Sequence, residues 1–230
     1  MASANIPAPT VGRLPTYLRA AVWLAAEGLE HVASDQFAAR VGISAATVRR
    51  DLSALGIRGT RGVGYDVKYL VYEFSVELGV DQQWPVAVVG AGNLGKALAN
   101  YTGMADRGFP IVALFDIDPK LVGARVGDIE VSHLDEMGRV VADRQIAVGV
   151  IATVAEGAQR SADALVEAGV SSILNFTTHR IQVAEGVVVR RVDLATELQI
   201  LSFYRQREQG AASGAGLPLG HSRAADGSYR

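Results

Sequence analysis

The sequence contains no cysteine among its 230 residues. Without a thiol the chain can form no disulfide, no thiolate zinc site and no cysteine nucleophile. The N-terminus also lacks a basic segment followed by an apolar core, which is the pattern of a signal peptide. No apolar run approaches the roughly 18 residues that are needed to span a bilayer. These absences together favour a folded protein of the cytoplasm.

A strong excess of charge of one sign is absent as well. The 22 lysines and arginines are balanced by 24 acidic residues, which gives a formal net charge of −2. A uniformly basic coat for nucleic acid is therefore excluded, and any such surface has to be local. Hydrophobic residues make up 49% of the chain, so one large domain or two small ones can bury a core.

Near the middle of the chain, a short apolar run leads into a glycine-rich turn. The run Val86–Val89 is typical of a strand buried on both faces, and residues 90–95 then match G-x-G-x-x-G before a helical stretch from Lys96. A second apolar run ends at Asp116, about twenty residues past the last glycine, where a dinucleotide fold places the carboxylate that holds the ribose hydroxyls. That carboxylate would repel a 2′-phosphate, so the spacing predicts a Rossmann fold that binds NAD rather than NADP.

The first third of the chain shows the pattern of a helix-turn-helix motif. Ser34 is expected to cap a short helix that Gly42 ends, and Ser44 is expected to cap a third helix that runs to about residue 55. The stretch over residues 56–65, rich in glycine and arginine, predicts a β-hairpin wing. Five arginines and one acid, Asp51, lie over residues 40–61, and this local excess of positive charge favours DNA as a partner.

A helix is expected before this motif, after a flexible arm over residues 1–11. Pro15 would lie near its first turn, and Arg19 would lie beside its apolar stripe. That stripe is expected to consist of Leu14, Leu18, Val22 and Ala25.

Helix and strand patterns alternate after Asp116 and predict a doubly wound, largely parallel sheet, so the fold class is α/β. A helix over residues 66–79 would link the two domains. The last helix, over residues 193–208, is apolar on more than one side, which indicates a partner subunit. The expected organisation is a flexible arm over 1–11, a winged-helix DNA-binding domain with its linking helix over 12–80, a Rossmann NAD(H)-binding domain over 81–192, a dimerisation helix over 193–209 and a disordered tail over 210–230.

A search for catalytic residues finds little. Of the four histidines, only His179, which follows a predicted strand, could reach the nicotinamide end of a bound dinucleotide. No Ser-x-x-x-Tyr-x-x-x-Lys pattern occurs, and no residues have the spacing of metal ligands. We therefore expect that the dinucleotide acts as a signal and that the protein is not an enzyme.

Several short motifs carry a resemblance to a known family. They are RLPTYLR over residues 13–19, TVRRDL over 47–52, GTRGVGY over 59–65, the glycine motif over 90–95, Asn175-Phe176, and Asp193-Leu194 with Glu197-Leu198-Gln199. In these motifs and in the order of its expected domains the chain resembles the redox-sensing transcriptional repressors called Rex. The resemblance spans roughly residues 14–207. The motif over residues 59–65 and the terminal helix are specific to this family, whereas the glycine motif is not. Thr177-Thr178 stand where many members have a proline.

The resemblance implies a homodimer whose terminal helices are swapped between protomers. Such a dimer binds a palindromic operator when NAD⁺ prevails and releases it when NADH binds. In the NADH state Tyr101 would contact Asp193 of the partner subunit, and in the other state Asp193 would pair with Arg19. The expected DNA-binding residues are Ser44, Thr47, Arg49, Arg50, Arg58, Arg61 and Tyr65. The expected cofactor-binding residues are Gly90, Ala91, Gly92, Asn93, Leu94, Gly95, Tyr101, Asp116, Thr153, Asn175 and Phe176.

Two other functions fit the same patterns. One is an NAD-dependent oxidoreductase with a DNA-binding appendage, in which His179 would be the catalytic acid. The other is a repressor whose Rossmann fold senses a different nucleotide, such as coenzyme A. Binding of NADH, and its effect on DNA binding, would separate these from redox sensing.

Overall fold

The computed structural model describes residues 6–214. It contains two units, which are described separately. The first consists of the chain up to Pro85 together with Thr102–Pro110, and the second of Val86–Tyr101 and the chain from Ile111 onward. The boundary that the sequence suggested near residue 80 therefore lies five residues later. Nothing in the sequence indicated that Thr102–Pro110, which contains the 3-10 helix η1 (Thr102–Arg107), belongs with the first unit.

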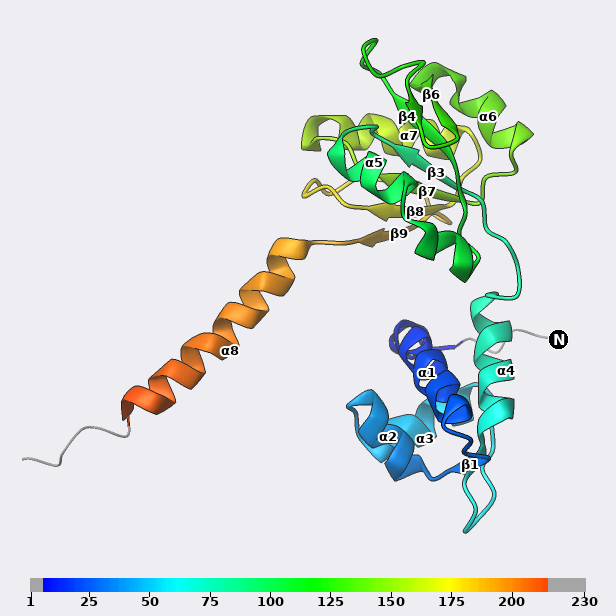
Figure 1. Cartoon of the computed structure of the whole chain (residues 1–230), viewed down its shortest axis with the longest axis vertical. Coiled ribbons are helices and arrows are strands. Elements are labelled where there is room, and N and C mark those ends of the chain that lie inside the picture. The colour runs from blue at the N-terminus through cyan, green and yellow to red at the C-terminus, as the bar shows by residue number, and fades with distance from the viewer. Residues whose placement is uncertain (1–5, 215–230) are drawn as a thin grey trace, which may run out of the picture. The chain divides into compact units, whose positions relative to one another are not determined.

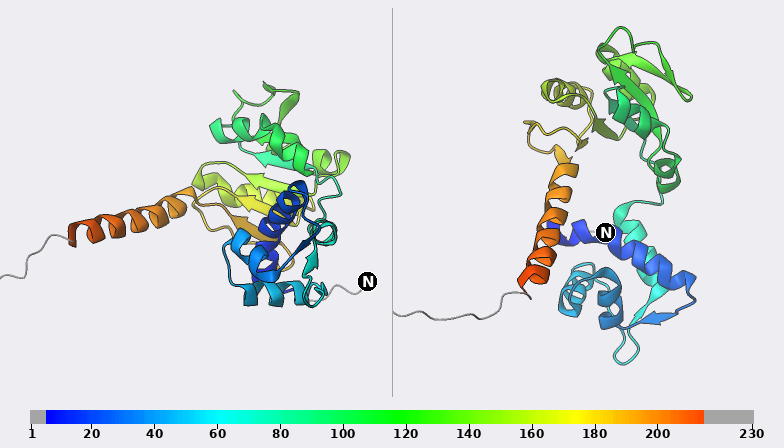
Figure 2. Two further views of the ribbon diagram at one scale, coloured as in Figure 1. Left: turned by 60° about the horizontal axis from the view of Figure 1, so that its bottom comes forward. Right: turned by 60° about the vertical axis from the view of Figure 1, so that its left-hand side comes forward.

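Over its described residues, the first unit contains, besides η1, four α-helices and a two-stranded sheet (Figures 1 and 2). The helices are α1 (Ala8–Ala26), α2 (Ser34–Val41), α3 (Ala45–Ala54) and α4 (Val67–Leu78), and the strands are β1 (His31–Val32) and β2 (Tyr65–Asp66), which pair antiparallel. The rings of Tyr17, Phe37 and Phe74 are fully buried and meet at the centre, with centroids 5.6–6.3 Å apart. This aromatic cluster joins α1, α2 and α4 into one core.

The structure corrects three expectations for α1. The helix begins at Ala8, so the flexible arm expected over residues 1–11 does not extend to Val11, and its first five residues lie outside the described residues. Pro9, not Pro15, lies in the first turn. The expected stripe is confirmed at Leu14, which is buried, and Leu18 is half-buried, but the stripe was wrong at Val22 and Ala25, which are exposed. The buried stripe continues from Leu14 at another helical spacing, because the large ring of Tyr17 packs in the aromatic core. Its members are Leu14, Tyr17, Ala21 and Leu24.

The helix-turn-helix motif and the linking helix are confirmed. Ser44 caps α3 by accepting the Thr47 N–H at 3.1 Å, and Gly42 ends α2 in the left-handed conformation. The helix expected over residues 66–79 is α4, which Asp66 caps and Gly79 ends. The cap assigned to Ser34 was wrong, because Ala33 is the N-cap of α2.

The wing differs from the expected hairpin. Residues 56–65 contain one isolated antiparallel bridge, between Thr60 and Gly64, and the strand that follows pairs with β1 rather than with the start of the stretch. Gly64 has a φ of +104°, and a Cβ there would collide with the carbonyl oxygen of Val32. The close approach of β1 therefore requires glycine at this position.

The second unit is a seven-stranded sheet in the order β5-β6-β4-β3-β7-β8-β9. Every pair is parallel except β5 with β6. Apart from the edge strand β5, this is the strand order of the dinucleotide-binding Rossmann fold, in which the first strand lies at the centre. The strands are β3 (Val86–Val89), β4 (Ile111–Asp116), β5 (Arg125–Val126), β6 (Ile129–His133), β7 (Val148–Ile151), β8 (Ser172–Asn175) and β9 (Val188–Arg191).

Helices cover both faces of this sheet, as the expected doubly wound fold requires (Figure 1). Because side chains alternate along a strand, Ala87 and Val89 of β3 face one side and Val88 faces the other. The first side packs against α6 (Met137–Asp143) and α7 (Ala158–Glu167) in one core cluster, while Val88 lies under α5 (Asn93–Ala99) at Gly95. The sheet is therefore buried on both faces, which explains the continuous apolar run of β3.

Two crossovers of this fold lack a helix. The chain between β4 and β6 makes turns and the short strand β5, and residues 176–187 between β8 and β9 form a loop. The terminal helix α8 (Leu194–Gly214) runs past the expected start of the tail at residue 210, and the remaining part of that tail lies outside the described residues. None of the helices over residues 6–214 is long and apolar enough to cross a membrane.

Candidate functional site

The glycine turn after β3 has the geometry that its motif predicts. Gly90 has a φ of +103°, and a Cβ there would lie 2.7 Å from the carbonyl oxygen of Ala152. A Cβ on Gly95 would collide with the carbonyl oxygen of Gly90, so α5 can approach the turn only because this residue has no side chain. Nothing lies within 4 Å of the position of a Cβ on Gly92. The turn is therefore closely packed at Gly90 and Gly95 and open at Gly92, where a pyrophosphate would approach the backbone.

Asp116, the last residue of β4, already has partners within the protein. Its Oδ2 accepts the Ala91 N–H at 2.7 Å, and its Oδ1 accepts the N–H groups of Ile117 and Asp118 at 2.8 and 2.9 Å. The carboxylate thus holds the glycine turn against the end of β4. Since an ionised carboxylate offers about four acceptor positions, acceptor capacity also remains for ribose hydroxyls.

A cleft of ≈ 380 Å³ lies at the carboxyl ends of β3, β4 and β7. This is the point where the strand order reverses, at which open α/β sheets bind their ligands. Thr153, which lines the cleft, has a buried Oγ1 without a hydrogen-bond partner among the described residues. An unsatisfied buried hydroxyl costs about 1–3 kcal/mol, so a ligand that pairs with Thr153 would stabilise the site.

The cleft brings together part of the expected cofactor set. Ala91 and Gly95 are buried within the turn, and Leu94 and Tyr101 are exposed on and after α5, outside the lining. Phe176 is half-buried and does not line the cleft either. The expected residues that line it are Gly90, Gly92, Asn93, Asp116 and Thr153.

The side chain of Asn175 is used by the protein itself. It is buried, its Nδ2 donates to the carbonyl oxygen of His179 at 2.9 Å, and its Oδ1 accepts the Thr177 N–H at 2.9 Å. Thr177 Oγ1 in turn accepts the His179 N–H at 3.3 Å. Asn175 therefore shapes the loop after β8, which explains why an amide stands there.

Sequence reasoning missed the residues that the loops after β4 and β7 bring into the cleft. Their signal was positional, because a ligand of an open α/β sheet touches the segments that follow the strands. That signal does not extend to Arg160, which reaches the cleft from within α7. The missed lining residues are Val89, Ile117, Asp118, Leu121, Leu134, Ala152, Val154, Gly157, Arg160 and Ser161.

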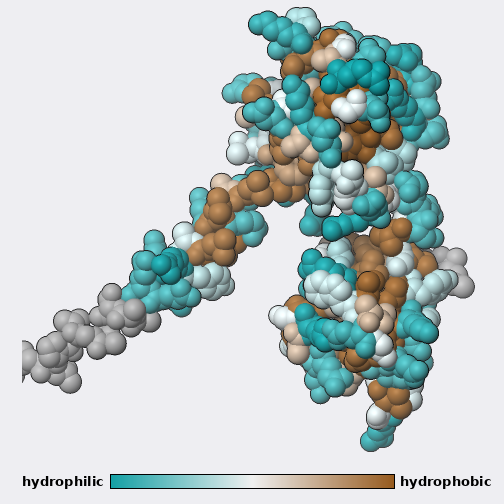
Figure 3. Space-filling model, in the orientation of Figure 1, coloured by the Kyte–Doolittle hydropathy of each residue, from teal (hydrophilic) through white to brown (hydrophobic). Residues whose placement is uncertain are grey.

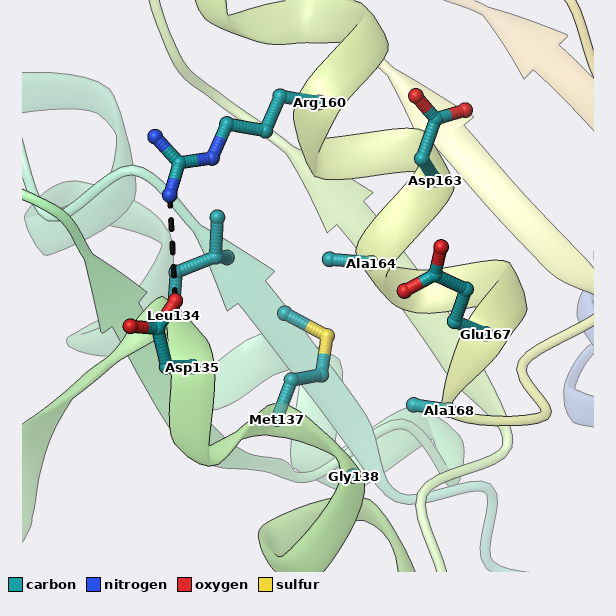
Figure 4. Close-up of a pocket in the computed structure, with 9 residues that line it drawn as sticks. All are labelled: Leu134, Asp135, Met137, Gly138, Arg160, Asp163, Ala164, Glu167 and Ala168. Atoms are coloured by element: carbon teal, nitrogen blue, oxygen red, sulfur yellow. Dashed lines mark ion pairs between the residues drawn. The ribbon is translucent and has the colours of Figure 1, made fainter.

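Arg160 also lines a second groove, of ≈ 350 Å³, between α7 on one side and the 3-10 helix η2 (Leu134–Glu136) with the start of α6 on the other (Figure 4). Its guanidinium lies 3.9 Å from the Asp135 carboxylate, the pair joined by the dashed line. Both side chains are largely exposed, so this ion pair is weak. Arg160 and Leu134 belong to both hollows, so the groove adjoins the cleft at its rim.

The first unit presents exposed arginines on α3 and in the wing. Arg49, Arg50, Arg58 and Arg61 are exposed, and within the described residues no ion pair involves them. Arg49 Nη1 donates to Ser34 Oγ at 2.9 Å. Each of these four exposed side chains has the chemistry for phosphate contacts.

The other residues expected at DNA have local structural roles. Ser44 caps α3, and its Oγ lies 2.8 Å from Thr47 Oγ1. Tyr65 is half-buried, and its ring lies 3.0 Å from where a Cβ on Gly59 would be. Arg40 was counted in the positive charge of this region, but it pairs with Glu27 at 2.6–2.7 Å and is locally neutralised.

Asp51 was counted as a charge that offsets the arginines, whereas the structure buries it under α3. Its side chain accepts hydrogen bonds from Tyr17 Oη at 2.5 Å, Thr10 Oγ1 at 2.9 Å, and Arg13 Nε and Nη2 at 2.7 and 2.8 Å. All three donors lie on α1. The motifs over residues 13–19 and 47–52 are thus the two halves of one polar contact that fixes α3 on α1.

The pKa values in this network follow from its contacts. Burial raises the pKa of Asp51, but the hydrogen bonds from Arg13, Tyr17 and Thr10 lower it by more, so the pKa falls below its ordinary value. The hydrogen bond to Asp51 raises the pKa of Arg13, and burial together with the bond to Asp51 raises the pKa of Tyr17. At neutral pH an ionised Asp51 therefore meets a cationic Arg13 and a protonated Tyr17.

The three residues expected to form a switch occupy separate elements. Arg19 is exposed on α1, with its guanidinium 5.6 Å from the centroid of the Trp23 ring. Tyr101 is 55% exposed after α5. Asp193 caps α8, where its Oδ1 accepts the N–H groups of Ala195 and Thr196, and these bonds lower the pKa of its carboxyl. Arg19 and Tyr101 are thus accessible to a partner, and Asp193, which is half-buried, is partly accessible.

Comparison with known proteins gives matches to both units. A family model described as a CoA binding domain matches residues 81–179, and one described as a putative DNA-binding protein N-terminus matches residues 5–53. The redox-sensing transcriptional repressor Rex of Streptomyces coelicolor is 53% identical over 94% of this chain and 85% of its own length. The Rex protein of Chloroflexus aggregans is 43% identical over 88% of this chain and 96% of its own length.

Solved structures agree. A Rex-family repressor called RSP matches with a TM-score of 0.82 and 30% identity, over 92% of this chain and 99% of its own. RSP has also been solved with NAD⁺ and operator DNA, with a TM-score of 0.82 and 31% identity over 92% of this chain and 97% of its own. A third RSP structure contains NADH and matches with a TM-score of 0.79 and 31% identity, over 92% and 99% of the two chains. The chain therefore belongs to the Rex family of redox-sensing transcriptional repressors.

Proposed function

We propose that this chain represses transcription by binding operator DNA through α3 and the wing, and that NADH bound in the cleft at Gly92 releases the DNA. One observation carries the proposal: a single polypeptide joins exposed arginines, which form no ion pair within the described residues, to a cleft with an open glycine turn. The Rex-family repressor RSP, which has the same fold, is known with NAD⁺ and operator DNA and with NADH.

The residues of the cleft fit an NAD molecule part by part. The open backbone at Gly92 and the start of α5 suit the pyrophosphate, because the first turn of a helix leaves N–H groups unpaired. Asp116 suits the hydroxyls of the adenosine ribose. Thr153 offers an unpaired hydroxyl to the ligand. When bound, the dinucleotide would supply a nicotinamide ring whose charge and shape depend on its oxidation state. Tyr101, Asn175 and Phe176 are proposed near that end.

Coenzyme A is the second candidate ligand, because the family model over residues 81–179 has its name. The adenosine end of the cleft argues against it. Asp116 and Asp118 both line this end, and coenzyme A has a phosphate on the adenosine ribose that their charges would repel. NAD has only hydroxyls there, which a carboxylate can bind.

For DNA we propose that Arg49 and Arg50 on α3 contact bases and backbone in a major groove. Arg58 and Arg61 in the wing would reach phosphates or the minor groove. Ser44 and Thr47 begin α3 and would contact the backbone, and Tyr65 would support the wing. The pairing of Arg40 with Glu27 leaves it out of this set.

The release step requires a difference between two conformations. By linkage, the free energy by which NADH prefers the released conformation equals the free energy of DNA binding that is lost when NADH binds. In allosteric proteins this coupling free energy is typically about 1–3 kcal/mol. We propose a homodimer with swapped α8 helices in which Asp193 pairs with Arg19 in the DNA-bound state and with Tyr101 in the NADH state. The exposure of Arg19 and Tyr101 and the partial exposure of Asp193 support this exchange.

The members of this family are transcription regulators, and we propose that this chain catalyses no reaction. His179, the one candidate acid, is exposed on the loop after β8 and does not line the cleft. We also propose that the protein acts in the cytoplasm, where it would meet both operator DNA and the NAD(H) pool.

One experiment tests the proposal. The purified chain is titrated with a fluorescent palindromic operator in the presence of NAD⁺, NADH or coenzyme A, and NADH binding is followed by fluorescence. We expect operator binding with NAD⁺ and release at micromolar NADH, with no effect of coenzyme A. Equal operator affinity under all three conditions would contradict redox sensing, and release by coenzyme A alone would support the second candidate.

A further inference from the structure

Between β8 and β9 the chain makes a parallel crossover without a helix. Such a connection usually contains a helix, but here residues 176–187 form a loop. The loop leads directly into β9, and β9 leads through Asp193 into α8. The start of α8 therefore depends on how this loop is held.

Gln159 of α7 holds the loop at one peptide position. Its Nε2 donates to the carbonyl oxygen of Gln182 at 2.8 Å, and its Oε1 accepts the Gln182 N–H at 2.8 Å. The same Nε2 donates to Asp163 Oδ1 at 2.8 Å, so the amide uses both of its protons. Because both polar groups of the side chain pair with both backbone groups of Gln182, the contact fixes the loop against α7 in one register.

The segment that begins α7 also lines the ligand cleft. Gly157, Arg160 and Ser161 belong to the lining, and Ser161 Oγ donates to the carbonyl oxygen of Gly157 at 2.8 Å. The unpartnered Thr153 Oγ1 is 3.3 Å from the position of a Cβ on Gly157. Residues 157, 160 and 161 share one side of the helix, while residue 159 is turned about 100° away from 160. A ligand and the loop therefore contact the same helical turn from different sides.

We propose that Gln159 is a positioning residue that couples the ligand cleft to α8 through the β8–β9 loop. The inference rests on the proposed function, because it takes NADH as the ligand that moves the first turn of α7. When the first turn of α7 moves, Gln159 displaces Gln182 and with it the loop. Because β9 connects the loop to Asp193, the start of α8 is displaced as well. The apolar residues Ile181 and Val183 also pack against the core, so the loop stays folded without the amide but loses its fixed register.

The test is Gln159→Ala in the full-length chain, with operator affinity measured in NAD⁺ and in NADH. The wild-type ratio of the two affinities is expected in the usual allosteric range of about 5–150-fold, and in Gln159→Ala it should fall toward about twofold. NADH affinity in the absence of DNA should stay within about threefold, because Gln159 does not line the cleft. A merely structural role would lower both affinities and leave their coupling unchanged.

Gln182→Ala is the matched control. Gln159 pairs with the backbone of residue 182, so removal of that side chain should leave the coupling at its wild-type value. Gln159→Glu retains the acceptor for the Gln182 N–H and loses the donor. Its coupling should therefore lie between that of the wild type and that of Gln159→Ala. Thermal unfolding of each variant establishes that it is folded.

Three results would overturn the inference. The first is full coupling in a folded Gln159→Ala, and the second is an equal loss of coupling in Gln182→Ala. Should Gln159→Ala fail to fold, full coupling in Gln159→Glu would be the third. A wild-type protein that ignores NADH would overturn the proposed function itself, which distinguishes the two failures.

Discussion

Asp51 is a carboxylate on the helix that is proposed to read DNA, yet it faces the protein. Its four hydrogen bonds come from side chains of α1, and the ion pair with Arg13 has exposed fractions of 2% for Asp51 and 31% for Arg13. The second ion pair of this unit, Arg40 with Glu27, is about equally exposed on both sides, at 41% and 45%. The two pairs thus differ in burial and provide a matched comparison.

We predict that Asp51→Asn lowers the free energy of unfolding of the first unit by about 2–3 kcal/mol. Removal of one partner from a buried pair costs about 3–5 kcal/mol, and the partial exposure of Arg13 reduces this. Glu27→Gln should cost less than about 1 kcal/mol, because exposed pairs contribute little. Both tryptophans, Trp23 and Trp84, belong to the first unit, so urea unfolding followed by their fluorescence measures the effect. Equal losses in the two variants would contradict the prediction.

The contribution of Asp51 should also depend on pH. Its pKa in the folded protein lies below the ordinary value of 3.8, so its stabilisation is fully present above that value and is lost as the pH falls through the folded pKa. The difference in free energy of unfolding between the wild type and Asp51→Asn should therefore be constant near neutral pH and shrink below about pH 4. Urea titrations at a series of pH values test this, and a difference that persists unchanged at pH 3 would refute it.

In the second unit, the packing at Gly95 leaves no room for a side chain. A Cβ there would meet the carbonyl oxygen of Gly90, a backbone atom that cannot turn aside. We predict that Gly95→Ala destabilises the second unit by about 1–3 kcal/mol or more and weakens NADH binding at least tenfold, because the turn must open. Circular dichroism on heating and NADH fluorescence titration measure the two effects.

Gly138 in α6 provides the control for Gly95. It is a helical glycine of the same unit, and nothing lies within 4 Å of the position of its Cβ. Gly138→Ala should be neutral or stabilise by about 0.5–1 kcal/mol through helix propensity. A Gly95→Ala variant as stable as Gly138→Ala would contradict the prediction, because it would show that the glycine turn can shift to accept a Cβ.

At the scale of elements, α3 is held by its buried side and leaves its outer side free. Val48, Asp51 and Leu52 are buried, while Arg49 and Arg50 point away from the core and are exposed. The polar network under α3 fixes the helix without using the arginines. An outer side of this kind is available to nucleic acid.

We predict that Arg50→Ala weakens operator binding by about 1–3 kcal/mol, which is the range for a lost base contact. NADH affinity should stay unchanged, because the cleft is in the other unit. Arg40→Ala, in which the lost arginine is paired with Glu27, should bind the operator within about twofold of the wild type. Gel-shift or anisotropy titrations measure both, and an unchanged Arg50→Ala would exclude this residue from the contact surface.

At the scale of the whole molecule, α8 has an apolar surface that this chain does not bury. Figure 3 shows hydrophobic residues along the first part of this helix and hydrophilic ones farther on. Isolated exposed apolar residues are ordinary, but a continuous set of this size indicates an interface. The exposed fractions are 67% for Leu194, 66% for Leu198, 46% for Ile200, 63% for Leu201, 51% for Phe203 and 60% for Tyr204.

We predict that the double change Leu198→Gln and Leu201→Gln shifts the proposed homodimer to the monomer. Each buried leucine contributes about 1.5–3 kcal/mol to an interface that excludes water, so the dissociation constant should rise at least a hundredfold. Gln206→Ala on the same helix should leave the dimer intact. Sedimentation at several concentrations measures the mass, and a double variant that remains dimeric at nanomolar concentration would rule out α8 as the main interface.

The local features of this fold could be derived from sequence. The glycine motif, the end of β4 at Asp116, the cap at Ser44 and the stop at Gly79 depend on neighbouring residues. A turn that needs a positive φ or a helix end that needs a cap restricts the residue type by itself. For this reason the α/β class, the helix-turn-helix motif and the glycine turn with Asp116 beside it were all predicted.

Other features depended on contacts between distant segments. Two stripes of α1 have helical spacing, and only the aromatic packing of Tyr17 against Phe37 and Phe74 decides which is buried. Asp51 reads as a surface charge until α1 supplies its partners, and Gln159 has no visible role until the β8–β9 loop lies beside α7. The spacing of residues in the sequence determines which of them share a side of a helix or strand. Which element covers that side depends on the packing of the whole chain.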